Sequence, residues 1–224
     1  MPPEAETEIG IRTGAMTPAD FTAATGVSRE TQARLETYAG LLRDWTRAIN
    51  LVAPRSLPDL WRRHMLDSAQ LLALLPAPPT GRPRRLVDLG SGAGFPGLVL
   101  AILGAGEVHL IESDRRKAAF LREAAQATAT PVTIHAVRAA EAPAPPADVV
   151  TARALAPLPR LLDLAAPFLA PDSVALFPKG RGVAQELTAA GKAWKIAATP
   201  YPSRTDPGGS ILYLEGIARG DTKS

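Results

Sequence analysis

Three glycines at alternate positions carry the clearest chemical signal in the chain. They fall within the segment Leu86-Val-Asp-Leu-Gly-Ser-Gly-Ala-Gly-Phe-Pro-Gly97, whose first residues have the apolar character of a buried strand. Gly90, Gly92 and Gly94 can adopt backbone dihedrals that are closed to other residues, and they let a ligand approach without interference from a Cβ atom. A strand that leads into such a turn and then into a helix predicts a site for a small adenosine-containing ligand.

Two enzyme classes fit this glycine pattern. The residues from Gly92 to Gly97 match the dinucleotide fingerprint G-x-G-x-x-G, which keeps a nicotinamide-dependent enzyme open. However, Asp88 precedes the glycines, at the carboxyl end of the strand where open α/β sheets bind their ligands. The order Asp-x-Gly-x-Gly-x-Gly resembles motif I of class I S-adenosylmethionine-dependent methyltransferases, which we favour. Pro96 fits the first turn of the next helix, because its missing N–H would have no partner there. The predicted cofactor residues of this segment are Asp88, Gly90, Gly92 and Gly94.

The ends of the later strands supply further candidates. Glu112 lies about twenty residues beyond the turn, where a carboxylate can accept hydrogen bonds from both ribose hydroxyls; a solvated strand-end acid is the alternative. The segment 138–141 should pass the adenine ring. Arg153 follows the fourth strand, beside the transferable methyl group or the incoming substrate, although such an arginine is commonly only an ion-pair partner. Lys179 follows the fifth strand and is interpreted as a phosphate contact or as part of a solvated turn.

The order of the elements predicts an α/β fold with a Rossmann-like, mostly parallel sheet, because strands and helices alternate. Pro207-Gly-Gly209 predicts a final hairpin and hence an antiparallel C-terminal edge. The expected strands are 85–89, 108–112, 131–136, 148–152, 173–178, 194–199 and 210–216. The expected helices between them are 95–103, 114–126, with Asp114 as its cap, 157–169 and 183–189.

A helical extension should precede this sheet. Residues 1–20 lack periodicity and read as a disordered arm, 21–80 as the helical extension, and 81–219 as the methyltransferase domain. One helix is expected to begin after Ser28, and a second at 57–75, before a proline-rich link. The apolar positions of the first are Leu35, Tyr38, Leu42, Trp45 and Ile49.

A polar cluster on the second helix has two interpretations. His64 lies three residues before Asp67, and Arg63 can pair with Asp67 at a spacing of i,i+4. Either His64 forms a wall of the RNA or cofactor pocket, or the cluster docks the extension onto the sheet. The sequence leaves both open.

Composition limits the classes of function. The chain has 224 residues, no cysteine and a formal net charge of +3. Disulfides, zinc-thiolate sites and cysteine nucleophiles are excluded, and we expect no metal site. No apolar run approaches the roughly 20 residues that span a bilayer, so we expect a protein of the cytoplasm without a membrane partner. The basic balance is compatible with a polyanionic partner, but a GC-rich genome explains the abundance of arginine equally well.

Several motifs in a fixed order make the resemblance specific. They are Asn50-Leu51, Arg63-His64-Met-Leu-Asp67-Ser68, the glycine segment from Asp88 to Gly97, Glu112-Ser-Asp-Arg-Arg-Lys-Ala-Ala-Phe-Leu121, Ala152-Arg-Ala154 and Lys179-Gly180. This series resembles the glucose-inhibited division protein B family, also called ribosomal RNA small-subunit methyltransferase G. The resemblance extends from about residue 35 to the end of the last strand.

The resemblance implies transfer of a methyl group from S-adenosylmethionine to N7 of a guanine in 16S ribosomal RNA. It implies that Gly90 and Phe95 contact the cofactor, that Ala140 and Glu141 flank its adenine, and that Arg153 lies at its reactive end as the catalytic residue. The sequence Arg-Ala-Ala-Glu allows a shift of one residue in the adenine assignment. The candidates for contact with RNA are Asn50, His64 and Lys179.

The residue types agree with a ring-nitrogen target. N7 of guanine carries a lone pair and no proton, so its methylation needs no general base. Methylation of pyrimidine carbon 5 usually needs a cysteine, and methylation of exocyclic adenine nitrogen typically uses an Asn/Asp-Pro-Pro-aromatic motif where this chain has Thr151-Ala-Arg-Ala154. Catalysis would then rest on orientation, which can contribute roughly 7–11 kcal/mol.

Two other functions stay open at this stage. One is a nicotinamide-dependent oxidoreductase that uses the same turn, and the other is a non-catalytic RNA-binding module. For the favoured methyltransferase, the substrate is 16S RNA, either naked or within a ribosomal particle. We expect the protein to act as a monomer.

Overall fold

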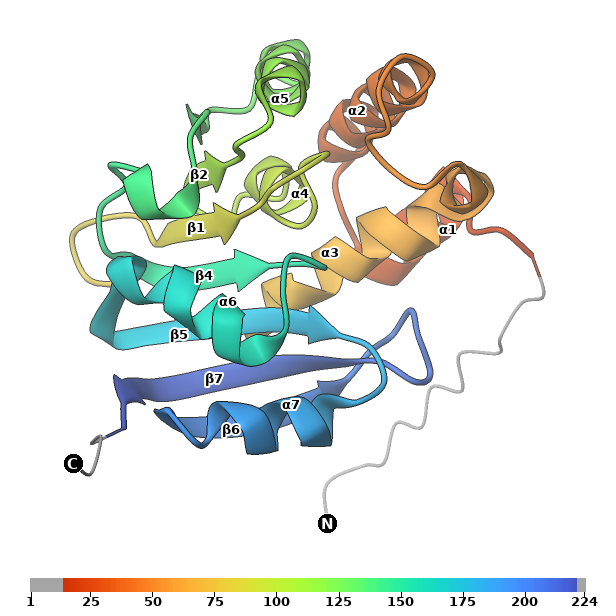
Figure 1. Cartoon of the computed structure of the whole chain (residues 1–224). Coiled ribbons are helices and arrows are strands. Elements are labelled where there is room, and N and C mark those ends of the chain that lie inside the picture. The colour runs from red at the N-terminus through yellow and green to blue at the C-terminus, as the bar shows by residue number, and fades with distance from the viewer. Residues whose placement is uncertain (1–13, 221–224) are drawn as a thin grey trace.

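A seven-stranded sheet occupies the centre of the computed structural model, which describes residues 14–220. The strand order is β3-β2-β1-β4-β5-β7-β6 (Figure 1). β1 to β5 are parallel, whereas β7 is antiparallel to both β5 and β6. This confirms the predicted parallel sheet with an antiparallel C-terminal edge. The strands are β1 Arg85–Leu89, β2 Glu107–Ile111, β3 Thr133–His135, β4 Ala147–Ala152, β5 Leu169–Lys179, β6 Trp194–Pro202 and β7 Ser210–Arg219.

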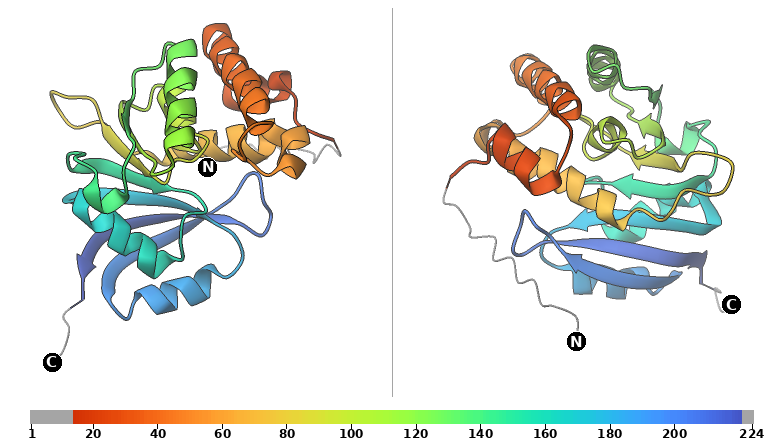
Figure 2. Two further views of the ribbon diagram at one scale, coloured as in Figure 1. Left: turned by 45° about the horizontal axis from the view of Figure 1, so that its top comes forward. Right: turned by 180° about the vertical axis from the view of Figure 1, so that it is seen from behind.

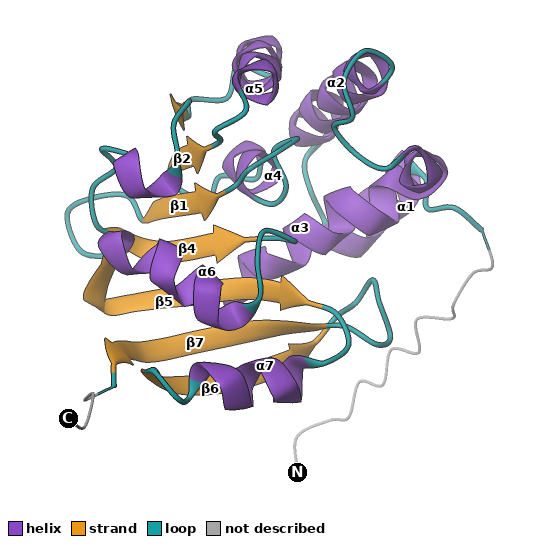
Figure 3. Ribbon diagram, viewed as in Figure 1, coloured by secondary structure: helices purple, strands orange, loops and turns teal. Residues whose placement is uncertain are grey.

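Helices cover both faces of the sheet (Figure 3). Successive side chains of a strand point to opposite faces, so Leu86 and Val108 pack in one core and Val87 and Ile111 in the other. The first core lies under α4 (Gly97–Ile102), α5 (Arg115–Ala127) and the N-terminal helices. The second lies under η4 (Ala139–Glu141), α6 (Leu158–Ala165), η5 (Ala166–Phe168) and α7 (Val183–Ala190).

The helical extension packs beside α4 and α5 (Figure 2). α2 (Arg29–Thr46) begins after Ser28, whose hydroxyl accepts the Thr31 N–H, as predicted. The expected second helix is a helical run over 54–74 in four pieces. These are the 3-10 helix η1 (Pro54–Asp59), the π-helix η2 (Trp61–Leu66), the α-helix α3 (Asp67–Ala69) and the 3-10 helix η3 (Gln70–Leu74). Within the described residues, no helix has both the length and the apolar character needed to cross a membrane.

A short helix, α1 (Pro18–Thr25), lies where sequence analysis placed the end of a disordered arm. The Thr17 hydroxyl accepts the Asp20 N–H at 3.1 Å, and Asp20 accepts the Thr17 N–H at 3.0 Å. This reciprocal capping box, with proline at the first helical position, is a recognisable start signal that the prediction missed. The arm boundary at residue 20 is therefore wrong, while residues 1–13 of the predicted arm lie outside the described residues.

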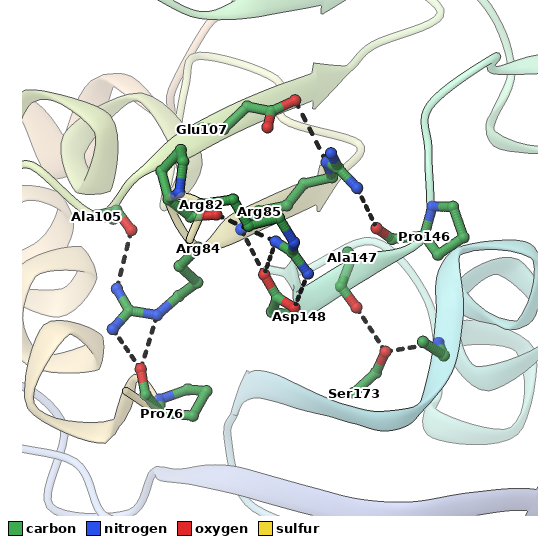
Figure 4. Close-up of polar contacts among 12 residues, drawn as sticks. Pro76, Arg82, Arg84, Arg85, Ala105, Glu107, Pro146, Ala147, Asp148 and Ser173 are labelled. Atoms are coloured by element: carbon green, nitrogen blue, oxygen red, sulfur yellow. Dashed lines mark hydrogen bonds and ion pairs between the residues drawn. The ribbon is translucent and has the colours of Figure 1, made fainter. Parts of the chain in front are cut away.

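Three arginines at the end of the proline-rich link form polar contacts near the amino ends of the strands β1, β2 and β4 (Figure 4). Arg82 forms a bidentate ion pair with Asp148 of β4: its Nη1 and Nη2 each donate to one carboxylate oxygen at 2.7 Å. Arg84 donates to Pro76 O and Ala105 O, and Arg85 reaches Glu107 of β2. These contacts join the strands at their amino ends, whereas the glycine turn follows the carboxyl end of β1.

Tyr38 of α2 connects the extension to the glycine turn. Its ring is fully buried between Phe95 and Phe120, with centroid distances of 5.6 and 6.2 Å. Its hydroxyl donates to the carbonyl of Ala93 within the turn. Burial raises the pKa of Tyr38 well above its usual value, so the hydroxyl remains a neutral donor. Packing of α2 and the shape of the turn thus depend on the same side chain.

Replacing Tyr38 with Phe should lower the free energy of unfolding by about 1–3 kcal/mol, because a buried carbonyl loses its partner. Urea denaturation followed by circular dichroism measures this change. The matched control is Tyr201→Phe, since Tyr201 is 39% exposed; it should stay within about 0.5 kcal/mol of the wild type. Equal stability of the Tyr38 variant and the wild type would contradict the prediction.

Candidate cofactor and substrate site

The glycine turn bends directly after β1 and is tied to the end of β2. Gly90, Gly92 and Gly94 have φ angles of +63°, +56° and +97°, the left-handed region that favours glycine. The N–H groups of Gly94 and Phe95 donate to Ser91 O at 2.7 and 3.2 Å. A Cβ on Gly94 would lie 2.8 Å from the Cβ of a neighbouring leucine. The backbone angles confirm that the turn needs glycines, and at Gly94 the missing side chain leaves room for packing in the core; contact of the turn with a cofactor stays a prediction.

Asp88 does not reach this surface. Its side chain is fully buried, and its two oxygens accept the Thr151 hydroxyl at 2.7 Å and the Gly97 N–H at 3.2 Å. A Cβ on Gly97 would lie 2.6 Å from the Cβ of Asp88, so this glycine is required for close packing. This corrects the expected role of Asp88. It positions the turn between β1, β4 and α4, and it is not exposed for direct contact with a cofactor.

Burial raises the pKa of Asp88 to about 6, because desolvation disfavours the charged carboxylate. The hydrogen bonds from Thr151 and Gly97 favour the charged form and oppose this shift without cancelling it. The carboxyl group therefore changes its charge just below neutral pH, within the support of the glycine turn.

Glu112 follows β2 and spans the gap to the glycine turn. One carboxylate oxygen accepts the Gly92 N–H at 2.8 Å, and the other accepts the Asp114 N–H at 2.7 Å. The side chain is 7% exposed. Asp114 caps α5 by accepting the Arg116 and Lys117 N–H groups, as predicted. Glu112 is therefore held beside the turn by two backbone N–H groups, and its role as a ribose ligand stays a prediction.

Phe95, His64 and Arg153 form a stack between the extension and the sheet. The imidazole of His64 lies on the Phe95 ring at a centroid distance of 4.8 Å, and the Arg153 guanidinium lies 5.0 Å from the same ring. Phe95 is only 4% exposed beneath them. The structure thus brings together three predicted site residues from three separate segments.

The hydrogen bonds of this stack fix the protonation of His64. The Arg153 Nη2 donates to His64 Nδ1 at 2.7 Å, because a guanidinium has donors only. The other ring nitrogen, Nε2, therefore carries the proton and faces the Ser56 hydroxyl at 2.8 Å. Burial, together with the charges of Arg153 and Arg63, lowers the pKa of His64 to about 3. His64 is neutral at pH 7 and docks the extension; contact with RNA stays a prediction.

Asp67 has a different partner from the one expected. Arg153 Nη1 donates to Asp67 Oδ2 at 3.1 Å and to Arg63 O at 3.0 Å. The predicted pair between Arg63 and Asp67 is therefore wrong: Arg63 contributes its carbonyl, and Asp67 balances the charge of Arg153. An arginine that is distant in sequence reaches Asp67, which local helical spacing could not reveal.

The tip of the β6–β7 hairpin contacts Asp67 as well. The Thr205 hydroxyl donates to Asp67 Oδ1 at 2.6 Å, and the Arg204 N–H donates to Gln70 Oε1 at 2.8 Å. Arg204 also reaches Ala24 O at 3.3 Å. The C-terminal hairpin and the N-terminal extension therefore meet at the site.

A cavity of about 500 Å³ opens beside Arg153 at the carboxyl ends of β4 and β5. Lys179 lines it, but only 10% of its side chain is exposed. Its ammonium donates to Ala156 O at 3.0 Å and to Glu186 at 2.8 Å. Lys179 thus has two internal partners, and its contact with a phosphate stays a prediction. The walls of the cavity come from the residues 153–157, 178–180, 203, 206 and 209–211, together with Asp67 and Glu186.

Three predicted residues lie outside these contacts. Asn50 is exposed in the turn after α2, and no hydrogen bond or ion pair among the described residues joins it to the Arg153 cluster. Ala140 and Glu141 are exposed on η4, after β3. Their roles toward RNA and adenine stay predictions.

The strand order and the helices on both faces define a Rossmann-like α/β protein. A solved S-adenosylmethionine-dependent methyltransferase from Aquifex aeolicus has the same fold, with a TM-score of 0.52 and 14% identity over 70% of this chain and 93% of that chain.

Closer relatives then define the family. The family model described as rRNA small subunit methyltransferase G matches residues 31–202. A protein of that name from Rhodospirillum centenum is 63% identical over 199 residues, 89% of this chain and 90% of the relative. Its counterpart from Paramagnetospirillum magneticum is 57% identical over 205 residues, 92% of this chain and 98% of the relative. The chain belongs to this family, as the sequence motifs predicted.

The pH dependence of stability should report the buried Asp88. Its folded pKa of about 6 exceeds the reference value of 3.8, so the folded protein binds the proton more tightly. The resulting stabilisation is complete below the unfolded pKa and is lost as pH rises through about 6. Relative to Asp88→Asn, the wild type should gain about 2 kcal/mol of unfolding free energy between about pH 7 and pH 4.

Urea denaturation at several pH values measures this difference between the variant and the wild type. Asp172→Asn is the matched control, because Asp172 is exposed on β5. Parallel pH profiles for the wild type and Asp88→Asn would contradict the assignment.

Proposed function

We propose that this chain transfers a methyl group from S-adenosylmethionine to N7 of a guanine in 16S ribosomal RNA. The observation that carries the proposal is the bond between Glu112 and the Gly92 N–H, which holds an acceptor for ribose hydroxyls against a turn of bare backbone. Membership of the rRNA small subunit methyltransferase G family supports the RNA substrate. It also favours this function over the oxidoreductase and the non-catalytic module.

The residues of the turn suit the adenosine end of this cofactor. A Cβ on Gly92 would meet only Gly90 O, at 3.7 Å, so the backbone there is open on its outer side. Each oxygen of Glu112 receives one internal N–H, and a carboxylate oxygen can accept a second hydrogen bond. Gly90, Gly92, Phe95 and Glu112 would hold the cofactor, with Ala140 and Glu141 beside its adenine.

When bound, S-adenosylmethionine supplies an electrophilic methyl group: the N7 lone pair forms the new N–C bond, the C–S bonding pair returns to sulfur, and the positive charge passes to the guanine. The residues of the chain need only orient the reactants. His64 cannot serve as a base, because Arg153 occupies the lone pair of its Nδ1. Asp67 balances the charge of Arg153, which limits repulsion of the sulfonium cation.

We further propose that the protein acts as a monomer in the cytoplasm, with Asn50 and Lys179 on the RNA side of the site. A methyl-transfer assay with purified protein and radiolabelled cofactor tests the function. Unmethylated 16S RNA, as naked RNA and as assembled particles, should accept label in at least one form. Mapping should then locate the label at N7 of one guanine. Absence of label from both forms would contradict the proposal.

Replacing Glu112 with Ala should weaken binding of S-adenosylmethionine by about tenfold or more, because hydrogen bonds to a charged group are worth about 1.5–3 kcal/mol. Isothermal titration calorimetry measures the affinity. Glu30→Ala is the control, since Glu30 is exposed in the first turn of α2. Unchanged affinity in the Glu112 variant would reject its role as ribose ligand.

A further inference from the structure

Leu155 lies directly over the first glycine of the turn. A Cβ built on Gly90 would lie 2.6 Å from Leu155 Cδ1 and 3.2 Å from Cδ2, so the leucine packs against the bare backbone of Gly90. The side chain is 39% exposed, although it is large and apolar. It also lines the cavity at the ends of β4 and β5. Leu155 therefore forms the boundary between the glycine turn and the cavity.

The loop is held on both sides of this side chain. Ala154 has a φ of +53°, a conformation that a non-glycine residue keeps only where its surroundings impose it. On the other side, the Lys179 ammonium donates to Ala156 O at 3.0 Å, and the Leu158 N–H donates to Glu186 at 2.6 Å. These contacts hold the backbone that follows Leu155.

We propose that Leu155 is a specificity-determining residue that limits the size of the alkyl group on the sulfonium cofactor. The inference rests on the proposed function and concerns a residue to which sequence analysis gave no role. Because Leu155 fills the space beside Gly90, a ligand on the glycine turn would lie next to this leucine. A group donated to a base in the cavity must then pass this side chain. An apolar side chain can distinguish alkyl groups only by their size, because it forms no hydrogen bond.

The test compares binding of S-adenosylmethionine and of S-adenosylethionine, which carries one more methylene, by calorimetry on the full chain. One methylene in an apolar pocket changes affinity by about 10–200-fold. We expect the wild type to prefer the methyl compound by about tenfold or more. Leu155→Ala should reduce this preference to about twofold or less, and Leu155→Val should give an intermediate value. Ethyl transfer to 16S RNA should rise in the same order.

Leu72→Ala is the matched control, because Leu72 is 38% exposed on η3 and does not line the cavity. It should keep the preference of the wild type. Thermal unfolding of each variant verifies the fold, and Leu155→Val preserves the test if the alanine variant is unstable.

Three results would overturn the inference. A wild type that binds both compounds equally has no size limit. A Leu155→Ala variant that binds both more tightly by the same factor shows that the leucine only covers the turn. A wild type that binds neither compound overturns the proposed function as well, so failure of the inference alone is distinguishable from failure of both.

Discussion

The buried carboxylate of Asp88 is the interaction on which the arrangement of the site depends. It joins a strand, the neighbouring strand and the start of a helix through Thr151 and Gly97. The last glycine of the motif is needed because no side chain fits between α4 and this carboxylate. Asp88 and Gly97, two residues of the glycine motif, therefore act beneath the turn and not on its outer side. Burial disfavours the charged form of Asp88. Keeping this carboxylate under the turn at neutral pH therefore reduces the free energy of unfolding.

Arg153 joins the parts of the molecule that lie above the turn. Its guanidinium holds together the carboxyl end of β4, the imidazole of His64 and the carboxylate of Asp67. Asp67 also accepts a hydrogen bond from Thr205 of the β6–β7 hairpin. The extension, the end of β4 and the hairpin are therefore linked through Arg153 and Asp67. The extension is thus a structural part of the site, and His64 contributes to the packing that makes it so.

Signals that are local in sequence predicted most of the fold. The strand β1, the caps Ser28 and Asp114, and the alternation of strands and helices depend on neighbouring residues, and they were found. The Thr17 capping box is equally local and was missed.

The internal partners of Lys179 and the burial of Asp88 could not be inferred in the same way. They depend on how the sheet and its loops pack, which brings together side chains that no spacing relates. Leu155 gave no signal, because a leucine in a loop has no distinctive pattern before Gly90 is known to lie beneath it.

The contact between the helical extension and the β6–β7 hairpin has a consequence for biosynthesis. Gln70 and its partner Arg204 are 134 positions apart, so at ~5–20 residues per second the ribosome takes roughly 7 to 27 seconds to make the second after the first. During that interval the extension is present without the hairpin that completes its contacts. A nascent chain therefore cannot form the contacts of Asp67 and Gln70 with the hairpin until residues 204 and 205 have been synthesised.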